Sequence, residues 1–227
     1  FQVSGGTPSG FVTITLPLSL TISKGGVSLT VDNLSTDVTN PAQLDSLGKL
    51  TIYVRGRLTV PTNQSPKSGL GGSFTLLVQD DSASVDDDAS ATIAASIVAP
   101  ISISPTTQLD FGNIAPSSIG GSLTVSTGGA STATNVTELA GASVSQGVLS
   151  VTGNGGANFS VSLPVNVTLT SASNSMTVNN FNHDGGATPS ISGGGTRTLN
   201  IGATLNVGAN QPGGSYSGTY FVTVNYN

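Results

Sequence analysis

The chain has 227 residues, of which 36% are apolar and 7% are charged, and its formal net charge is −5. So much apolar material can bury a core, which excludes disorder driven by charge, and six basic residues argue against a nucleic-acid surface. The absence of cysteine excludes disulfides, thiolate metal sites and thiol nucleophiles.

The opening stretch, FQVSGGTPSGFVTITLPLSLTIS at residues 1–23, returns downstream as LSVTGNGGANFSVSLPVNVTLTS at residues 149–171. The match pairs Phe11 with Phe159 and then needs a slip of one residue. Three further blocks follow in the same order in both copies: SLTVDNLSTD (28–37) with SMTVNNFNHD (175–184), GRLTVPTNQSP (56–66) with ATLNVGANQP (203–212), and GGSFTLLVQ (71–79) with SGTYFVTVN (217–225). Because an internal repeat sets the architecture, the chain is predicted to hold two copies of one half of a folding unit.

Apolar and polar residues alternate along most of the chain, as in LTIYVRGRLTV (50–60) and YFVTVNY (220–226). A period of two, interrupted by turn signals such as KGG, GNGG and NQPGG, indicates half-buried antiparallel strands of a β-sandwich. No convincing helix is predicted. The best candidate for a single helical turn is NPAQLDSLGKL (40–50), where Asn40-Pro41 resembles a cap followed by proline at the first helical position.

These signals predict an all-β fold of tandem antiparallel β-sandwiches, the first of them incomplete. Residues 1–80 are expected to form a partial sandwich, residues 81–89 an acidic linker, and residues 90–227 a complete sandwich. The linker is placed in QDDSASVDDDAS because clustered like charges repel and resist packing. The front strands that the first sandwich lacks are expected to come from residues that precede Phe1 or from another molecule.

The acidic run has a second interpretation as a Ca²⁺ site, since Ca²⁺ takes about six to eight oxygen ligands. The spacing lacks the glycine and the distant glutamate of an EF-hand, so a solvated linker is favoured. The residues concerned are Asp80, Asp81, Asp86, Asp87 and Asp88.

SATIAASIVAPISIS (90–104) alternates for longer than an ordinary strand of about 5–6 residues. Pro100 indicates a sheet edge or a switch between sheets, since proline donates no ladder hydrogen bond. A strand this long can serve two sheets, or a sheet in another subunit. Its apolar face carries Ala91, Ile93, Ala95, Ile97, Ala99, Ile101 and Ile103.

Groups for catalysis are scarce, so neither an enzyme nor a cofactor is expected. The one histidine, His183, precedes Asp184, and consecutive side chains of a strand point to opposite faces. Aromatic residues near the end could mark a sugar-binding face, although Tyr220 corresponds to Phe74 of the other copy, which favours a core role. The aromatic residues in question are Tyr216, Tyr220, Phe221 and Tyr226.

The segment LDFGNIAP (109–116), preceded by IVAPISISPTTQ and followed by the ending GANQPGGSYSGTYFVTVNY, resembles the bacterial DUF4402 family. That family is similar in turn to the spore coat protein U-like pilins of archaic chaperone–usher systems. The resemblance covers 90–227 well and 1–80 as a second, partial copy. It implies an immunoglobulin-like, pilin-like sandwich that is incomplete by itself and takes a strand from a neighbour. It brings no catalytic residues, and the cysteine pair of many such pilins is absent.

Resemblance and alternation together predict a structural subunit of an extracellular bacterial filament or pilus, for which 91–103 is the donor strand. The expected partners are copies of the chain in a head-to-tail homopolymer, a periplasmic chaperone and an outer-membrane usher. A membrane span is not predicted, because no apolar run reaches about 18 residues, and a secreted form would have lost its signal peptide. The alternative is a non-polymeric surface adhesin or carbohydrate-binding module. Whether the donor strand acts within or between chains stays open.

Overall fold

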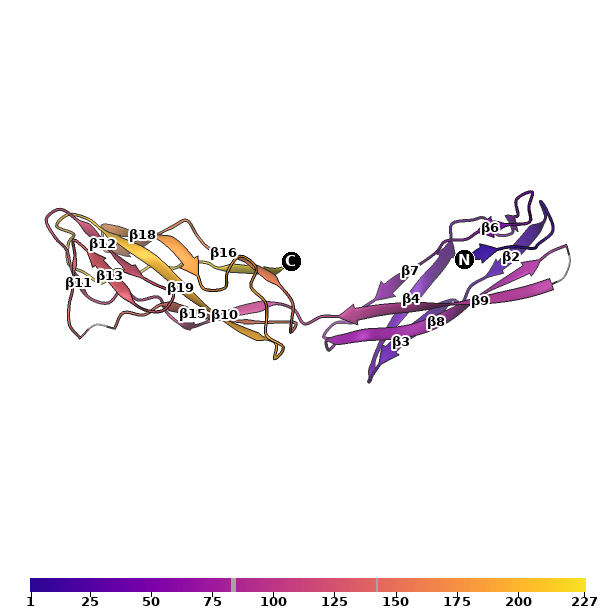
Figure 1. The fold of residues 1–227 in the computed structure, drawn as a ribbon, viewed down its shortest axis with the longest axis horizontal. Helices are drawn as coiled ribbons and strands as arrows, with labels where there is room; N and C mark the ends of the chain where they lie inside the picture. Colours follow the sequence, from indigo (N-terminus) through magenta and orange to yellow (C-terminus); the bar gives the residue numbers. More distant parts are fainter. Residues whose placement is uncertain (83–84, 142) are drawn as a thin grey trace. The chain divides into compact units, whose positions relative to one another are not determined.

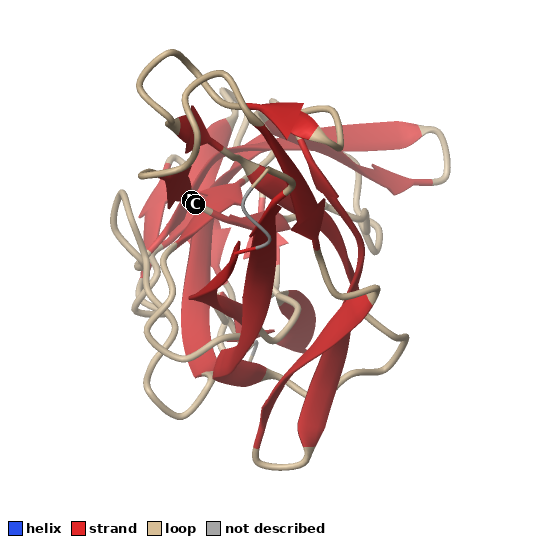
Figure 2. Cartoon of the chain, turned by 90° about the vertical axis from the view of Figure 1, so that its right-hand side faces the viewer, coloured by secondary structure: helices blue, strands red, loops and turns tan. Residues whose placement is uncertain are grey.

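The computed structural model describes residues 1–82, 85–141 and 143–227. The chain divides into two compact units, which we call unit 1 (Phe1–Val98) and unit 2 (Ala99–Asn227) (Figure 1). Over the described residues all regular structure is β-strand, without a helix (Figure 2). No helix that could span a membrane is therefore found among them. The predicted all-β fold of antiparallel β-sandwich domains is confirmed.

Unit 1 is built on an antiparallel sheet in the order β5-β2-β8-β3-β4-β7, with β9 paired to β8, and on a small sheet of β1 and β6. Its strands are β1 (Gln2–Val3), β2 (Phe11–Thr15), β3 (Ser19–Lys24), β4 (Val27–Thr36), β5 (Ala42–Gln43), β6 (Leu50–Thr51), β7 (Val54–Thr59), β8 (Lys67–Asp80) and β9 (Val85–Ile97).

Unit 2 has a main sheet in the order β10-β15-β19-β12-β13, to which β18 adds on β19 and β17 on β18. Two further pairs are β11 with β14 and β16 with β20. Its strands are β10 (Ser102–Thr107), β11 (Ile114–Ala115), β12 (Gly121–Val125), β13 (Ser131–Thr134), β14 (Thr137–Glu138), β15 (Gly147–Thr152), β16 (Phe159–Ser162), β17 (Asn166–Ser171), β18 (Asn174–His183), β19 (Thr196–Val207) and β20 (Thr223–Tyr226).

The period-two alternation of apolar and polar residues determines which side chains form the core. In β4, Val27, Leu29 and Val31 are buried while the residues between them are exposed. The inward residues of each unit gather into two apolar clusters, which pack around Leu29 and Leu76 in unit 1 and around Leu205 and Leu199 in unit 2. Burial of apolar area is the main force that holds such sheets together.

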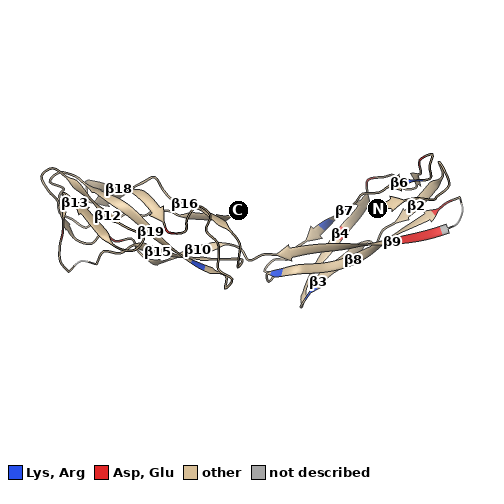
Figure 3. Ribbon diagram, in the orientation of Figure 1, with Lys and Arg blue, Asp and Glu red and all other residues tan. Residues whose placement is uncertain are grey.

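The boundary between the units lies at Val98/Ala99, and not in the acidic segment 81–89 where charge had placed it. Unit 2 accordingly begins at 99 instead of 90. Residues 86–88 lie in β9 with exposed carboxylates (Figure 3), and the part of the expected linker at 83–84 lies outside the described residues. Exposed carboxylates remain in water, so a run of them is compatible with a hairpin strand as well as with a linker.

The best candidate for a helical turn, 40–50, does not form one, and this segment instead forms β5 and a tight turn. The Asn40 side chain accepts a hydrogen bond from Ile14 N and donates one to Ile14 O, both at 2.9 Å, and so pairs with β2 as a strand would. The Asp45 carboxylate accepts hydrogen bonds from Leu47 N and Lys49 N at 2.8 and 2.9 Å. Both polar side chains satisfy backbone groups without a helix.

Candidate functional site

Strand β9 covers one edge of the unit 1 sheet. It runs antiparallel to β8 in unbroken register from Val85 opposite Asp80 to Ala95 opposite Leu70. The inward face of β9, which includes Ile93 and Ala95, packs against the cluster of β3, β4 and β8. Backbone pairing and alternate apolar side chains both hold β9, as they hold a strand that is added to a sheet edge.

The segment 90–104, predicted to be one long strand, is two strands in two units. β9 ends at Ile97 and β10 begins at Ser102, with Pro100 between them. In this structure β9 therefore serves its own chain. The predicted donor residues on β9 in unit 1 are Ala91, Ile93, Ala95 and Ile97, and those in unit 2 are Ala99, Ile101 and Ile103.

The two units share a strand plan that follows the repeat. The pairs β2–β8, β3–β4 and β4–β7 of unit 1 correspond to β16–β20, β17–β18 and β18–β19 of unit 2. Even a local distortion repeats, because Asn33 and Asn180 have φ of 51° and 53° where β4 and β18 bulge. Asparagine tolerates this left-handed region better than most residues.

The structure moves one residue match of the repeat, that of Phe11 with Phe159, by one position. Val12 pairs with Asp80 as Phe159 pairs with Tyr226, so Val12, and not Phe11, occupies the place of Phe159. Val12 and Phe159 are 1% and 0% exposed, whereas Phe11 is 48% exposed. The slip in the alignment disappears when burial, instead of aromatic identity, defines the match.

Gly72 and Gly218 mark the same close approach in the two units. A Cβ atom on Gly72 would lie 2.6 Å from the Thr21 carbonyl oxygen, and one on Gly218 would lie 2.5 Å from that of Thr168. Only glycine fits where two backbones approach so closely. β8 and the last segment of unit 2 therefore follow the same path over β3 and β17.

The edge that β9 covers in unit 1 is open in unit 2. Residues 213–222 correspond to the first part of β8, yet no strand of the described chain pairs along their outer edge. Beside them lies a groove of about 1060 Å³, which segment 105–114 also lines. Apolar side chains of β17, β18 and β19 line it as well, namely Val167, Leu169, Met176, Val178, Leu205 and Val207. We call this groove, with its edge 213–222, the unit 2 groove.

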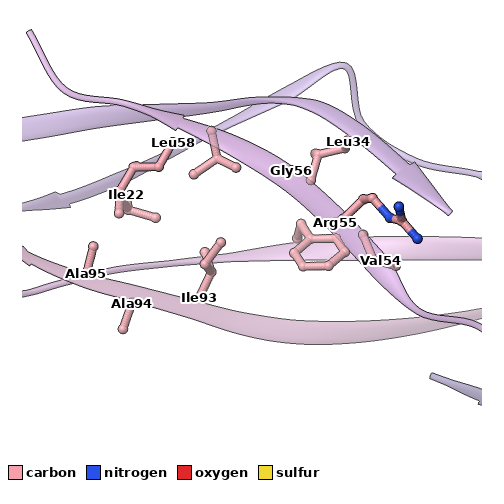
Figure 4. A pocket seen from close by; sticks show the side chains of 11 residues that line it. Ile22, Leu34, Val54, Arg55, Gly56, Leu58, Ile93, Ala94 and Ala95 are labelled. Atoms are coloured by element: carbon pink, nitrogen blue, oxygen red, sulfur yellow. The ribbon is translucent and has the colours of Figure 1, made fainter. Parts of the chain in front are cut away.

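Unit 1 has a smaller groove of about 270 Å³ between β7 and β9 (Figure 4). In unit 2 the equivalent strand, β19, is flanked by β12, whereas no strand among the described residues pairs with the matching edge of β7. Leu58 and Val60 are consequently 42% and 51% exposed, whereas Leu205 and Val207 are 2% and 5% exposed.

Of the four C-terminal aromatic residues, Tyr216, Tyr220 and Phe221 line the unit 2 groove, whereas Tyr226 does not. The Tyr226 hydroxyl accepts a hydrogen bond from Asn154 N at 2.6 Å and donates one to Ala99 O at 2.7 Å. Burial raises the pKa of Tyr220, and its ring lies 5.4 Å from that of Phe181. Tyr216 donates to Pro212 O, and Phe221 is 80% exposed.

His183 and Asp184 have separate structural bonds. The Nδ1 atom of His183 accepts a hydrogen bond from Gly185 N at 3.1 Å. The Asp184 carboxylate accepts from Asn200 N and from its side-chain amide, at 2.9 and 2.7 Å. Asp37 accepts from Tyr53 N at the matching place in unit 1, so this aspartate belongs to the repeated fold.

The acidic residues proposed for Ca²⁺ have different local partners. Asp80 accepts hydrogen bonds from Thr7 N and Ser82 N, and Asp81 accepts one from the Thr13 hydroxyl. Across 1–82, 85–141 and 143–227, no three or more His, Cys, Asp or Glu side chains form a group that could hold a metal ion.

Sequence reasoning did not identify the unit 2 groove, although one signal for it was present. The match of GGSFTLLVQ (71–79) to SGTYFVTVN (217–225) places the same strand edge in both copies. The sequence instead predicts the gap in the first sandwich and a complete second one, because alternation is visible in one strand, whereas a groove needs several strands brought together.

Comparison with protein families adds one finding. A family model described as "Domain of unknown function (DUF4402)" matches residues 1–79 and 101–226. β9 lies between the two matched segments. No curated protein matches the chain.

Proposed function

We propose that this chain, which belongs to the DUF4402 family, is a structural subunit of an extracellular bacterial filament or pilus, polymerised by donor-strand complementation. The observation that carries the proposal is the position of β9. This strand lies outside both family matches, immediately precedes unit 2 in the sequence, and covers the β8 edge of unit 1, the unit to which it belongs. A strand that covers a sheet edge within one chain can cover the matching edge of another copy in the same way.

Strand donation produces a polymer because the two surfaces in contact differ. Donor and acceptor lie on different parts of each subunit, so the contact is head to tail and leaves a free donor and a free acceptor at the two ends. The main-chain bonds supply affinity, and the alternate side chains supply specificity. These properties suit a filament whose subunits are identical.

The proposal includes assembly partners at the cell surface. An open apolar groove beside an unpaired edge is an aggregation hazard, so a periplasmic chaperone would cover it until an outer-membrane usher exchanges it for the next subunit. LDFGNIAP (109–116) and the C-terminal ending resemble the DUF4402 family, and the similarity of that family to spore coat protein U-like pilins is what suggests these partners.

The alternative, a non-polymeric adhesin or carbohydrate-binding module, has less support. Such a site needs exposed aromatic or polar side chains that converge, and of the four C-terminal aromatic residues only Phe221 is largely exposed. A glycan array with reproducible hits that Phe221→Ala abolishes would favour this alternative.

Immunogold microscopy of producing cells tests the proposed function. Antibodies against the chain are expected to label filaments at regular intervals along the shaft. Label confined to filament tips would indicate an adhesin, and label on dispersed protein without filaments would contradict the proposal.

A further inference from the structure

We infer that the unit 2 groove is the acceptor for β9 of a second copy of this chain, bound antiparallel to 213–226 with Ser90 beside Phe221. The inference rests on the proposed function and specifies its acceptor, its donor and their register. Unit 1 supplies the template, because β9 occupies the matching edge there.

The register follows from the repeat. Thr75 lies opposite Ser90 in unit 1, and the alignment of 71–79 with 217–225 places Phe221 where Thr75 lies. The close approaches of Gly72 and Gly218 to equivalent threonine carbonyls fix the same alignment in space.

The open edge of unit 2 has less regular strand and less burial than β8, its counterpart in unit 1, as expected of an edge that no strand covers. β8 is a strand of 14 residues, whereas the matching segment 213–226 contains only the four-residue strand β20. Only these last residues of the segment have a ladder partner, β16. Leu70 and Leu76 are 0% and 1% exposed beneath β9, but the matching Tyr216 and Val222 are only partly buried. A donor strand paired with this edge would remove the remaining apolar surface of Tyr216 and Val222 from water.

The inward face of β9 also complements the groove in size. In the inferred register the large Ile93 faces Gly218, and the small Ala91 and Ala95 lie beside Tyr220 and Tyr216. Large side chains thus meet small ones at each step, which is how facing layers interdigitate without voids. The groove walls are mainly apolar or uncharged, with Asp110 as the charged group that lines it.

In this exchange β9 leaves the edge of β8 in its own chain and pairs with a similar edge, 213–226, of another copy. β9 must leave β8 of its own chain before it can pair with 213–226 of another, so the numbers of ladder bonds lost and gained are alike. Exchange is then slow, because the hairpin has to open, and is driven by subunit concentration. A synthetic peptide with the sequence 86–98 carries the same inward face and avoids the opening step.

Disulfide trapping tests the register, because the chain has no cysteine of its own. The full chain with Phe221→Cys is mixed with the 86–98 peptide carrying Ser90→Cys under mild oxidation. We expect a one-to-one adduct, and we expect its loss when the peptide also carries Ile93→Asp, since a carboxylate would be buried against Gly218. Phe221 is 80% exposed, so the substitution leaves the fold intact, which circular dichroism verifies.

Two matched controls define the outcome. Thr75→Cys with Ser90→Cys in one chain should close within unit 1, where the two hydroxyl oxygens are 3.0 Å apart. Thr219→Cys should react with a Thr92→Cys peptide in preference to the Ser90→Cys peptide, because Ser73 lies opposite Thr92 in the template.

The inference is overturned if Phe221→Cys gives no more adduct than with a scrambled peptide, or if both peptides react equally at both positions. The result is separable from the proposed function. Labelled filaments without the adduct would leave the filament role standing and reject this acceptor, whereas an adduct without filaments would keep the acceptor and reject the filament role.

Discussion

Units 1 and 2 repeat one strand plan but leave opposite edges open. In unit 1, β9 covers the β8 edge, whereas no strand among residues 1–82 and 85–98 pairs with the outer edge of β7. In unit 2, β12 covers β19, whereas no strand of the described residues pairs with the outer edge of 213–222. Equivalent leucines therefore differ in exposure, at 42% for Leu58 and 2% for Leu205. The difference teaches that the neighbouring strand, and not residue type, decides which apolar side chains become core.

The largest expected effect separates these two leucines. Leu205→Ala removes a buried side chain and should lower the free energy of unfolding of unit 2 by about 2–5 kcal/mol. Leu58→Ala should lower that of unit 1 by less than about 1 kcal/mol, because its side chain is already partly in water. Differential scanning calorimetry of both variants measures the two shifts. Equal shifts would contradict the assigned difference in cover.

The two close-approach glycines should instead behave alike. Gly72→Ala and Gly218→Ala each place a methyl group against a backbone carbonyl and should cost about 1–3 kcal/mol. Gly193→Ala is the matched control, since its Cβ would meet nothing within 4 Å. Denaturant midpoints compare the three variants, and a neutral Gly218→Ala would show that segment 214–226 does not follow the path of β8.

The Tyr226 hydroxyl holds the first residue of unit 2, Ala99, by a hydrogen bond. Tyr226→Phe removes the hydroxyl that bonds Asn154 N and Ala99 O, and we expect a loss of about 1–2 kcal/mol. Tyr53→Phe serves as the control, because Tyr53 is 69% exposed. Thermal unfolding should move for the first variant alone, and an unchanged midpoint for Tyr226→Phe would be inconsistent with these two bonds.

The smallest effect concerns the ion pair of Asp32 and Arg57, whose places in unit 2 are taken by the uncharged Asn179 and Thr204. Arg57 donates to Asp32 at 2.9 and 3.0 Å, and this hydrogen bonding lowers the pKa of Asp32. A carboxyl with a lowered folded pKa adds stability above its unfolded pKa, and this contribution is lost as the pH falls through the folded value.

Arg57→Leu should return the Asp32 pKa toward its usual range, whereas Arg55→Leu should leave it in place. An NMR titration of the carboxyl carbon measures both. Because the pair is exposed, its effect on stability should be small and should shrink further in salt. An Asp32 pKa that does not change in Arg57→Leu would refute the role of the pair.

Much of the fold could be predicted from the sequence because its physics is local. Alternation in a strand such as 27–36 predicts which residues are buried, and the repeat indicates that two such units exist. The part that failed depends on long-range contacts. Charge placed a linker at 81–89 because clustered carboxylates repel, but the exposed strand residues 86–88 are solvated equally well. Pro100 did indicate a sheet edge or a switch between sheets, but the alternation across it did not show that β9 and β10 belong to different units.

Hydrogen exchange on the full chain tests the central comparison most directly. The backbone amides of 70–76 that point toward β9 should exchange slowly, and those of 213–222 should exchange rapidly except at Ser217, which bonds Thr170 O. Adding the 86–98 peptide should slow exchange in 213–222. Equal protection of both segments in the free chain, or no change in 213–222 with saturating peptide, would contradict the account.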